Sequence, residues 1–91
     1  MNRRIGVIGI VIEDPRLVSE KVNAIISQHG DIVLGRMGIP RPEYQVGVVS
    51  LIIEGTTDEI GSLTGRLGNI PGVTVKSALT TKTLRKEQDH D

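Results

Sequence analysis

Residues 5–12 read IGVIGIVI and residues 46–53 read VGVVSLII, two runs that are apolar at nearly every position. Side chains of a β-strand point alternately to opposite faces of its sheet, so both faces of these two strands must be covered. A chain of 91 residues with two plausible helices covers one of those faces from within. The other face needs a further layer, most simply a second copy of the same chain.

The first half of the chain has the signals of a strand, a helix and a second strand. The first strand is expected over residues 4–12. Asp14 suits the N-cap of the following helix, Pro15 its first position and Gly30 the residue after its end. The next strand, over 32–39, stops at a turn with two prolines, which a central strand would not contain.

The second half has the same order of elements. A strand over 45–54 is followed by Thr56 and Glu59, which have the spacing of a capping box and open a helix. That helix ends at 68–69, and the last strand covers 73–79. The order βαββαβ predicts an α+β ferredoxin-like sandwich, a four-stranded antiparallel sheet in the order 4-1-3-2 with two helices on one face.

A single domain over residues 1–80 contains all of these elements. Residues 81–91 have one apolar side chain, Leu84, among many charged ones. Such a segment cannot bury enough surface to offset its chain entropy, so we expect a disordered tail. The alternative is an interaction arm that becomes ordered on a partner.

Composition narrows the classes of partner. Eleven basic side chains balance eleven acidic ones, and Tyr44 is the one aromatic residue, so direct binding of nucleic acid is not expected. No cysteine is present, which rules out disulfides and thiolate metal sites in this sequence. No run has the length of a transmembrane helix. We expect a cytoplasmic protein with no membrane partner.

No set of residues points to catalysis, and we expect no enzyme activity, no cofactor and no metal. His29 and His90 share no ligand spacing, and Ser50 lies within a strand without a histidine to activate it. A hydrolase of the acylphosphatase type is the enzyme alternative. It would need an arginine in a loop after the first strand with an asparagine nearby, whereas Arg16 and Asn23 fall on the first helix.

Three features point to contacts between subunits. Val7 and Val49 are candidates for the uncovered sheet face, although the runs do not show which face each occupies. Gly61 and Gly65 each lower helix stability by about 1 kcal/mol relative to Ala, so this helix is expected to approach the sheet closely or, alternatively, a helix of another subunit. Arg36 interrupts an apolar strand, either to protect an edge or to meet an anion between subunits.

Five segments resemble a known family. These are RIGVIGIV (4–11), GRMGIP (35–40), GTTDEI (55–60), GRLGNIPGV (65–73) and VKSA (75–78). Together they are similar to the family of iron-only hydrogenase system regulators. The resemblance covers residues 3–79 and implies an ACT-like ferredoxin fold, similar to the C-terminal domain of the nickel-responsive repressor. The histidines and cysteine that bind metal in that domain have no counterparts here, and the chain has no room for its DNA-binding segment.

The resemblance implies an oligomeric regulatory module, a dimer or a tetramer, that acts through a regulatory protein partner. The alternative is an ACT-type sensor of a small-molecule effector. ACT effectors lie where the turn after the first strand of one subunit meets the second strand of its neighbour. That turn usually has a glycine near the helix start, which is missing here. The matching positions are Glu13 and Asp14 in the turn and Arg36, Met37, Gly38 and Ile39 across the boundary.

Overall fold

Two strands of eleven residues form the centre of the fold. The computed structural model describes residues 3–81. In it β1 (Arg3–Glu13) pairs antiparallel with β3 (Val46–Thr56) along the full length of both strands. The two apolar runs of the sequence are therefore direct neighbours, and each is flanked by a further strand.

The other elements surround this central pair. The sheet order is β2-β3-β1-β4, which confirms the predicted order and the ferredoxin-like α+β fold. Neither helix is long and apolar enough to cross a membrane. The remaining elements are α1 (Pro15–Gln28), the 3-10 turn η1 (Gly30–Ile32), β2 (Val33–Arg41), the 3-10 turn η2 (Pro42–Tyr44), α2 (Thr57–Gly68) and β4 (Val73–Leu79).

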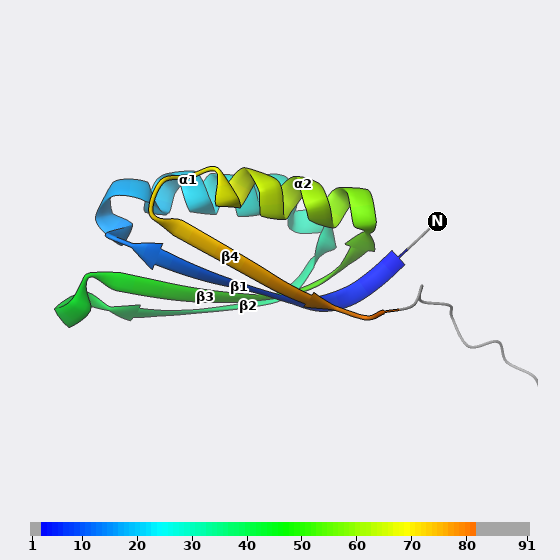
Figure 1. Ribbon diagram of the computed structural model, residues 1–91, viewed down its shortest axis with the longest axis horizontal. Helices are drawn as coiled ribbons and strands as arrows, with labels where there is room; N and C mark the ends of the chain where they lie inside the picture. The colour runs from blue at the N-terminus through cyan, green and yellow to red at the C-terminus, as the bar shows by residue number, and fades with distance from the viewer. Residues whose placement is uncertain (1–2, 82–91) are drawn as a thin grey trace, which may run out of the picture.

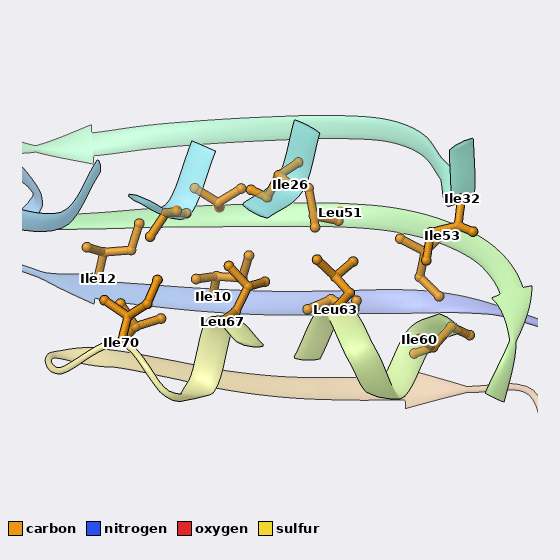
Figure 2. Close-up of a cluster of buried hydrophobic side chains, with 14 residues drawn as sticks. Ile10, Ile12, Ile26, Ile32, Leu51, Ile53, Ile60, Leu63, Leu67 and Ile70 are labelled. Carbon is orange, nitrogen blue, oxygen red and sulfur yellow. The ribbon is translucent and has the colours of Figure 1, made fainter. Parts of the chain in front are cut away.

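The core lies between the sheet and the two helices, which both cover the same face (Figure 1). Alternate residues of the central strands point into it, because side chains along a strand alternate between the faces. Figure 2 shows how the aliphatic side chains from both layers interdigitate. The fully buried ones are Ile8, Ile10, Val22, Leu51, Ile53, Leu63 and Leu67.

The ends of β2 differ from the prediction. The strand begins at Val33 because residues 30–32 form a 3-10 turn, and it runs on through Pro40 to Arg41. Proline is tolerated there because β2 is an edge strand, whose outer side needs no ladder hydrogen bonds. Residues 82–91, which make up most of the predicted tail, lie outside the described residues.

The prediction that Asp14 caps α1 with its side chain is wrong. Asp14 does occupy the N-cap position, but it has a left-handed backbone (φ 54°, ψ 65°) and makes no side-chain capping bond. Its Oδ1 instead lies 3.4 Å from Nε of Arg16. Asp is among the few side chains that adopt this conformation at modest cost, and the turn from β1 into α1 requires it.

The predicted capping box of α2 is present in both directions. The backbone N–H of Glu59 donates to the Thr56 hydroxyl at 3.1 Å, and the backbone N–H of Thr56 donates to Oε1 of Glu59 at 2.8 Å. The bond from the Thr56 backbone lowers the pKa of the Glu59 carboxyl from its ordinary value. Desolvation opposes this shift, whereas the Thr56 hydroxyl and the charge of Arg3 add to it. The ionised carboxylate is thus favoured by folding.

This gives a prediction for acid stability. A carboxyl whose pKa is lowered by folding stabilises the fold at pH values above its unfolded pKa, and that stability is lost as pH falls through the folded pKa. Glu59→Gln keeps an acceptor for the Thr56 N–H but cannot titrate. We expect its unfolding free energy, measured by urea denaturation between pH 6 and 2, to fall less steeply below about pH 4.5 than that of the wild type. Equal slopes would contradict this role of Glu59.

Gly6 allows β4 to approach β1 closely. Gly6 pairs with Leu79, and a Cβ added at Gly6 would overlap the carbonyl oxygen of Ala78 and lie 2.9 Å from Cα of Leu79. Both of those atoms belong to the backbone, so the clash cannot be relieved by a side-chain rotation. Gly9, on the same strand, is different: the nearest atom to its added Cβ is 3.8 Å away, an ordinary contact.

We therefore expect Gly6→Ala to lower the unfolding free energy by about 2 kcal/mol, as overpacked sites do. Gly9→Ala is the matched control, and its unfolding free energy should change by less than about 0.5 kcal/mol. Chemical denaturation followed by circular dichroism measures both. Equal stability of the two variants would show that β4 is not held against β1 at Gly6.

Candidate functional site

The face of the sheet opposite the helices is open. Figure 1 shows α1 and α2 on one side of the sheet and no element of residues 3–81 on the other. Strand register shows which side chains occupy this open face. Val7 lies opposite Ile52, and Val11 lies opposite Val48, which in turn pairs with Ile39 of β2. These pairs form a patch that spans three of the four strands.

The apolar side chains of this patch are large and substantially exposed. Patches of this kind on a single chain mark sites of interaction with another molecule. We use the name open-face patch for the following six residues, with the exposed fraction of each: Val7 39%, Val11 43%, Met37 65%, Ile39 54%, Val48 43% and Ile52 41%.

The structure separates the two valines proposed for the interface. Val7 belongs to the open-face patch, and its place at an interface stays a prediction. Val49 is 8% exposed and belongs to the core between sheet and helices, so its prediction as an interface residue is wrong. Its neighbours Val48 and Ser50 point to the open side, because side chains alternate along β3.

The favoured explanation for Gly61 and Gly65 is also wrong. Both are exposed, and a Cβ added at either would meet no atom within 4 Å. They do not allow α2 to approach the sheet, because the buried side of α2 is formed by Ile60, Leu63 and Leu67. The alternative, a contact of this helix with another subunit, stays a prediction.

Arg36 points to the helix side of the sheet, towards α1. Its strand partner is Leu51, which is fully buried under the helices, so the Arg36 side chain shares that face. Nη2 of Arg36 donates to Oδ1 of Asn23 on α1 at 2.5 Å. The Arg36 side chain therefore lies between the edge strand β2 and the helix α1. Its predicted role, to protect the edge or to contact an anion, stays a prediction.

Arg36 is part of the wall of a cleft of about 180 Å³. The cleft lies between the first half of α1 and the strands β2 and β3. A second hollow of about 350 Å³ adjoins it at Pro15 and Pro40 and extends towards the η2 turn. The lining of the first cleft is Ile12, Pro15, Ser19, Val22, Asn23, Arg36, Gly38, Ile39, Pro40, Gly47, Val48 and Val49.

The predicted effector residues only partly come together. Arg36 and Gly38 line the cleft from the helix side of β2. Ile39 also borders the cleft, but it lies opposite Val48, so its side chain faces the open side of the sheet, as does that of Met37 opposite Ser50. Glu13 and Asp14 are not part of the lining. Sequence reasoning missed Asn23 and Pro15 as members of this site. The sequence does show that Asn23 lies on the polar side of the first helix and that Pro15 is at its start. It does not show that both residues face β2.

The backbone beside the cleft has two unusual residues. Asp14 and Gln45 are the non-glycine residues with positive φ among those described, at 54° and 55°. They are joined directly, because the N–H of Asp14 donates to the carbonyl oxygen of Gln45 at 2.9 Å. This bond fixes the β1–α1 turn, in which Asp14 has its left-handed backbone, against the β2–β3 turn.

His29 has a structural role in this geometry. Its Nδ1 lies 2.8 Å from the carbonyl oxygen of Ile25, and since a carbonyl only accepts, Nδ1 carries the proton. Nε2 lies 3.2 Å from the hydroxyl of Ser62 on α2, so the ring links the two helices. Among residues 3–81, no group of three His, Cys, Asp or Glu side chains is placed to hold a metal ion.

Solved structures with the same fold include one close match and several distant ones. Protein TM1266 from Thermotoga maritima superposes with a TM-score of 0.81 at 32% identity, over 85% of this chain and 96% of its own. The ACT domain of GTP pyrophosphokinase from Chlorobium tepidum has a TM-score of 0.64 at 20% identity, over 99% of this chain and 100% of its own.

A third match is CPII from Thiomonas intermedia K12, a nitrogen regulatory PII-like protein bound to ADP, AMP and bicarbonate. It has a TM-score of 0.56 at 12% identity and covers 89% of this chain and 97% of its own. The two distant matches show the ACT- and PII-like fold alone. No curated protein matches the chain.

The match at the level of sequence is to a family model. Residues 4–77 match the TM1266-like model, which describes a proposed regulator of the iron-only hydrogenase system. The matched range includes both helices, β2, β3, all but the ends of β1 and β4, and the residues that line the cleft. It confirms the family to which the five sequence segments pointed. The chain therefore belongs to the TM1266-like, iron-only hydrogenase system regulator family.

Proposed function

We propose that this protein is a homo-oligomeric regulatory module of the iron-only hydrogenase system that acts through a protein partner. The observation that carries the proposal is the open-face patch, an apolar surface in the middle of the sheet that no described part of the chain covers. The family supplies the link to hydrogenase, and the patch supplies the mode of action. A surface of this kind is expected to be buried in the working protein.

The size of the open face suits a dimer. Strands of 7 to 11 residues, spaced about 4.8 Å apart with a rise of about 3.3 Å per residue, give a face on the order of 600 Å². A stable protein–protein interface buries about 800 Å² on each partner, so most of such an interface is available on one copy. Two sheets packed face to face would also be a common arrangement, about 10 Å apart.

The distribution of charge supports a second copy as the cover. Charged side chains lie at the ends of the central strands, where Nε of Arg3 is 3.4 Å from Oε2 of Glu54. Lys76, opposite Gly9, lies on the edge strand β4. An apolar centre with a charged rim is the normal anatomy of an interface. A two-fold axis would place one apolar centre on the other and leave the rim in water.

A second candidate function is that of a sensor of a small molecule. The observation that favours it is the cleft beside Arg36, which contains most of the predicted effector positions from β2. The two functions are compatible, since a partner can respond to the liganded state of an oligomer.

Replacement of Val7 by Asp tests the interface. Val7 is already 39% exposed in one chain, so the charge does little to the folded subunit, but at an interface it would be buried without a partner. We expect the dissociation constant of the oligomer to rise about 100-fold or more, since burial of an unpaired charge costs about 3–5 kcal/mol. Native mass spectrometry over a range of concentrations measures this.

Leu17→Asp is the matched control, because Leu17 is an exposed apolar residue (76%) on α1, away from the open face. The control variant should keep the mass of the wild-type assembly, and circular dichroism should show that both variants are folded. A folded Val7→Asp variant with an unchanged assembly mass would exclude the open face as the interface. A monomeric wild type would exclude the oligomer itself.

The regulatory role has a test in cells. In a strain that encodes this protein and an iron-only hydrogenase, deletion of its gene should change hydrogenase activity per cell. Leu17→Asp should restore the original level, whereas Val7→Asp should not. An unchanged hydrogenase level after deletion would contradict the regulatory role. Restoration by a monomeric Val7→Asp protein would show that regulation does not need the assembly.

A further inference from the structure

We propose that the cleft between α1 and β2 binds a small aliphatic carboxylate, with Arg36 holding the carboxylate and the apolar wall holding the hydrocarbon part. The inference rests on the sensor function given above and names the class of its ligand. It also places the ligand within one subunit, between the first helix and the edge strand of the same chain, rather than at a boundary between two chains.

Arg36 lacks the ion pair that three other arginines have. Arg3, Arg16 and Arg41 each have a carboxylate within 3.4 Å. Among the described residues Arg4 has no carboxylate either, but its Nη1 donates to the carbonyl oxygen of Thr80 at 3.0 Å and it does not line the cleft. Within residues 3–81, Arg36 has no carboxylate partner, and its side chain donates to Asn23. A guanidinium has five N–H donors in a rigid plane, so one bond to a neutral amide fixes the side chain and leaves donors for a second group.

The free donors of Arg36 suit an anion of planar shape. A carboxylate accepts two parallel N–H bonds from one guanidinium, an arrangement that gives both strength and orientation. The wall of the cleft beside Arg36 is largely aliphatic and offers contacts to a hydrocarbon group. The charge of Arg36 is therefore complemented best by a ligand that brings one negative group and a hydrocarbon tail.

The volume of the cleft sets the size of that tail. A protein cavity of about 150 Å³ holds benzene, a ligand of six carbons. The 180 Å³ cleft thus fits a ligand of about this size, and Ile12, Val22 and Val49 present aliphatic groups to it. The hollow beyond Pro15 and Pro40 offers room for a longer chain.

The same lining argues against an α-amino acid. An amino acid brings an ammonium group, which needs an acidic or several neutral acceptors when it leaves water. Among the described residues that line the cleft there is no Asp or Glu, and the polar side chains are those of Ser19, Asn23 and Arg36. Asn23 already accepts from Arg36. A carboxylate without an amine is thus favoured over the matching amino acid.

Hexanoate is the probe for this site, with hexan-1-ol, hexylamine and norleucine as matched compounds. We expect hexanoate to bind the full chain with a dissociation constant of about 1 mM or tighter, because a ligand of this size is held by few contacts. The alcohol, the amine and the amino acid should bind at least about 10-fold more weakly. Hexan-1-ol and hexylamine have no carboxylate to pair with Arg36, and norleucine brings an ammonium group for which the cleft has no acidic acceptor among the described residues. Amide shifts in ¹⁵N-labelled protein measure affinity and location together.

Two variants separate the carboxylate contact from the tail contact. Arg36→Gln should lower the affinity for hexanoate about 10-fold or more. It should leave the already weak affinity for hexan-1-ol unchanged. Arg41→Gln is the control, since Arg41 lies on the same strand and pairs with Glu43. Gly38→Val should exclude both compounds. Its Cβ would make ordinary contacts, the nearest at 3.8 Å from Val49, and its branches would enter the cleft.

Several outcomes would overturn the proposal. Norleucine that binds as tightly as hexanoate would show that the ligand class is wrong, and hexanoate shifts confined to other residues would show that the site is wrong. An Arg36→Gln protein that is folded and keeps full affinity for hexanoate would remove Arg36 from the site. A change in assembly mass in that variant would show that Arg36 meets a second copy instead of a ligand.

These outcomes are distinct from failure of the proposed function. Loss of the ligand proposal leaves the assembly mass and the Val7→Asp result as they are. Loss of the oligomer leaves hexanoate binding to be measured on the monomer, because the cleft is built from one chain. The ligand proposal and the oligomer proposal are therefore tested by separate measurements.

Discussion

The pairing of β1 with β3 is the constraint on which the rest of the structure depends. It joins two strands of eleven residues that are apolar on both faces and places them at the centre of the sheet. One of these faces is covered by α1 and α2, and Ile8, Ile10 and Leu51 are fully buried there. The other face has the same aliphatic character and no cover in the described chain. This pairing is the reason for which we propose a second layer over that face.

Much of the fold was predictable because its signals are local or topological. The capping box of Thr56 and Glu59 depends on spacing within one turn, and it is present in the structure. The sheet order follows from two crossover connections and was also confirmed. Local signals fail where the backbone has a special conformation. Asp14 is a residue type that often caps helices, yet in this turn its side chain makes no hydrogen bond to the first N–H groups of α1.

The side-chain positions that could not be predicted share a physical cause. A strand that is apolar on both faces has no alternation of polar and apolar residues, so the sequence cannot show that Val48 is exposed and Val49 buried. Which alternate residues are buried depends on the face of the sheet on which the helices pack. The contact between Arg36 and Asn23 joins residues 13 positions apart in different elements, and it depends on the angle at which α1 crosses β2. No local pattern encodes that angle.

Solvent accessibility of the methyl groups on the open face tests the central claim most directly. Methyl-labelled protein with a soluble paramagnetic agent reports the accessibility of Val7, Val11, Ile39, Val48 and Ile52 in the intact assembly. If a second layer covers this face, their relaxation enhancements will be close to those of the core residue Leu51. If they relax as fast as Leu17, which is 76% exposed, the face is open to water and the account is wrong.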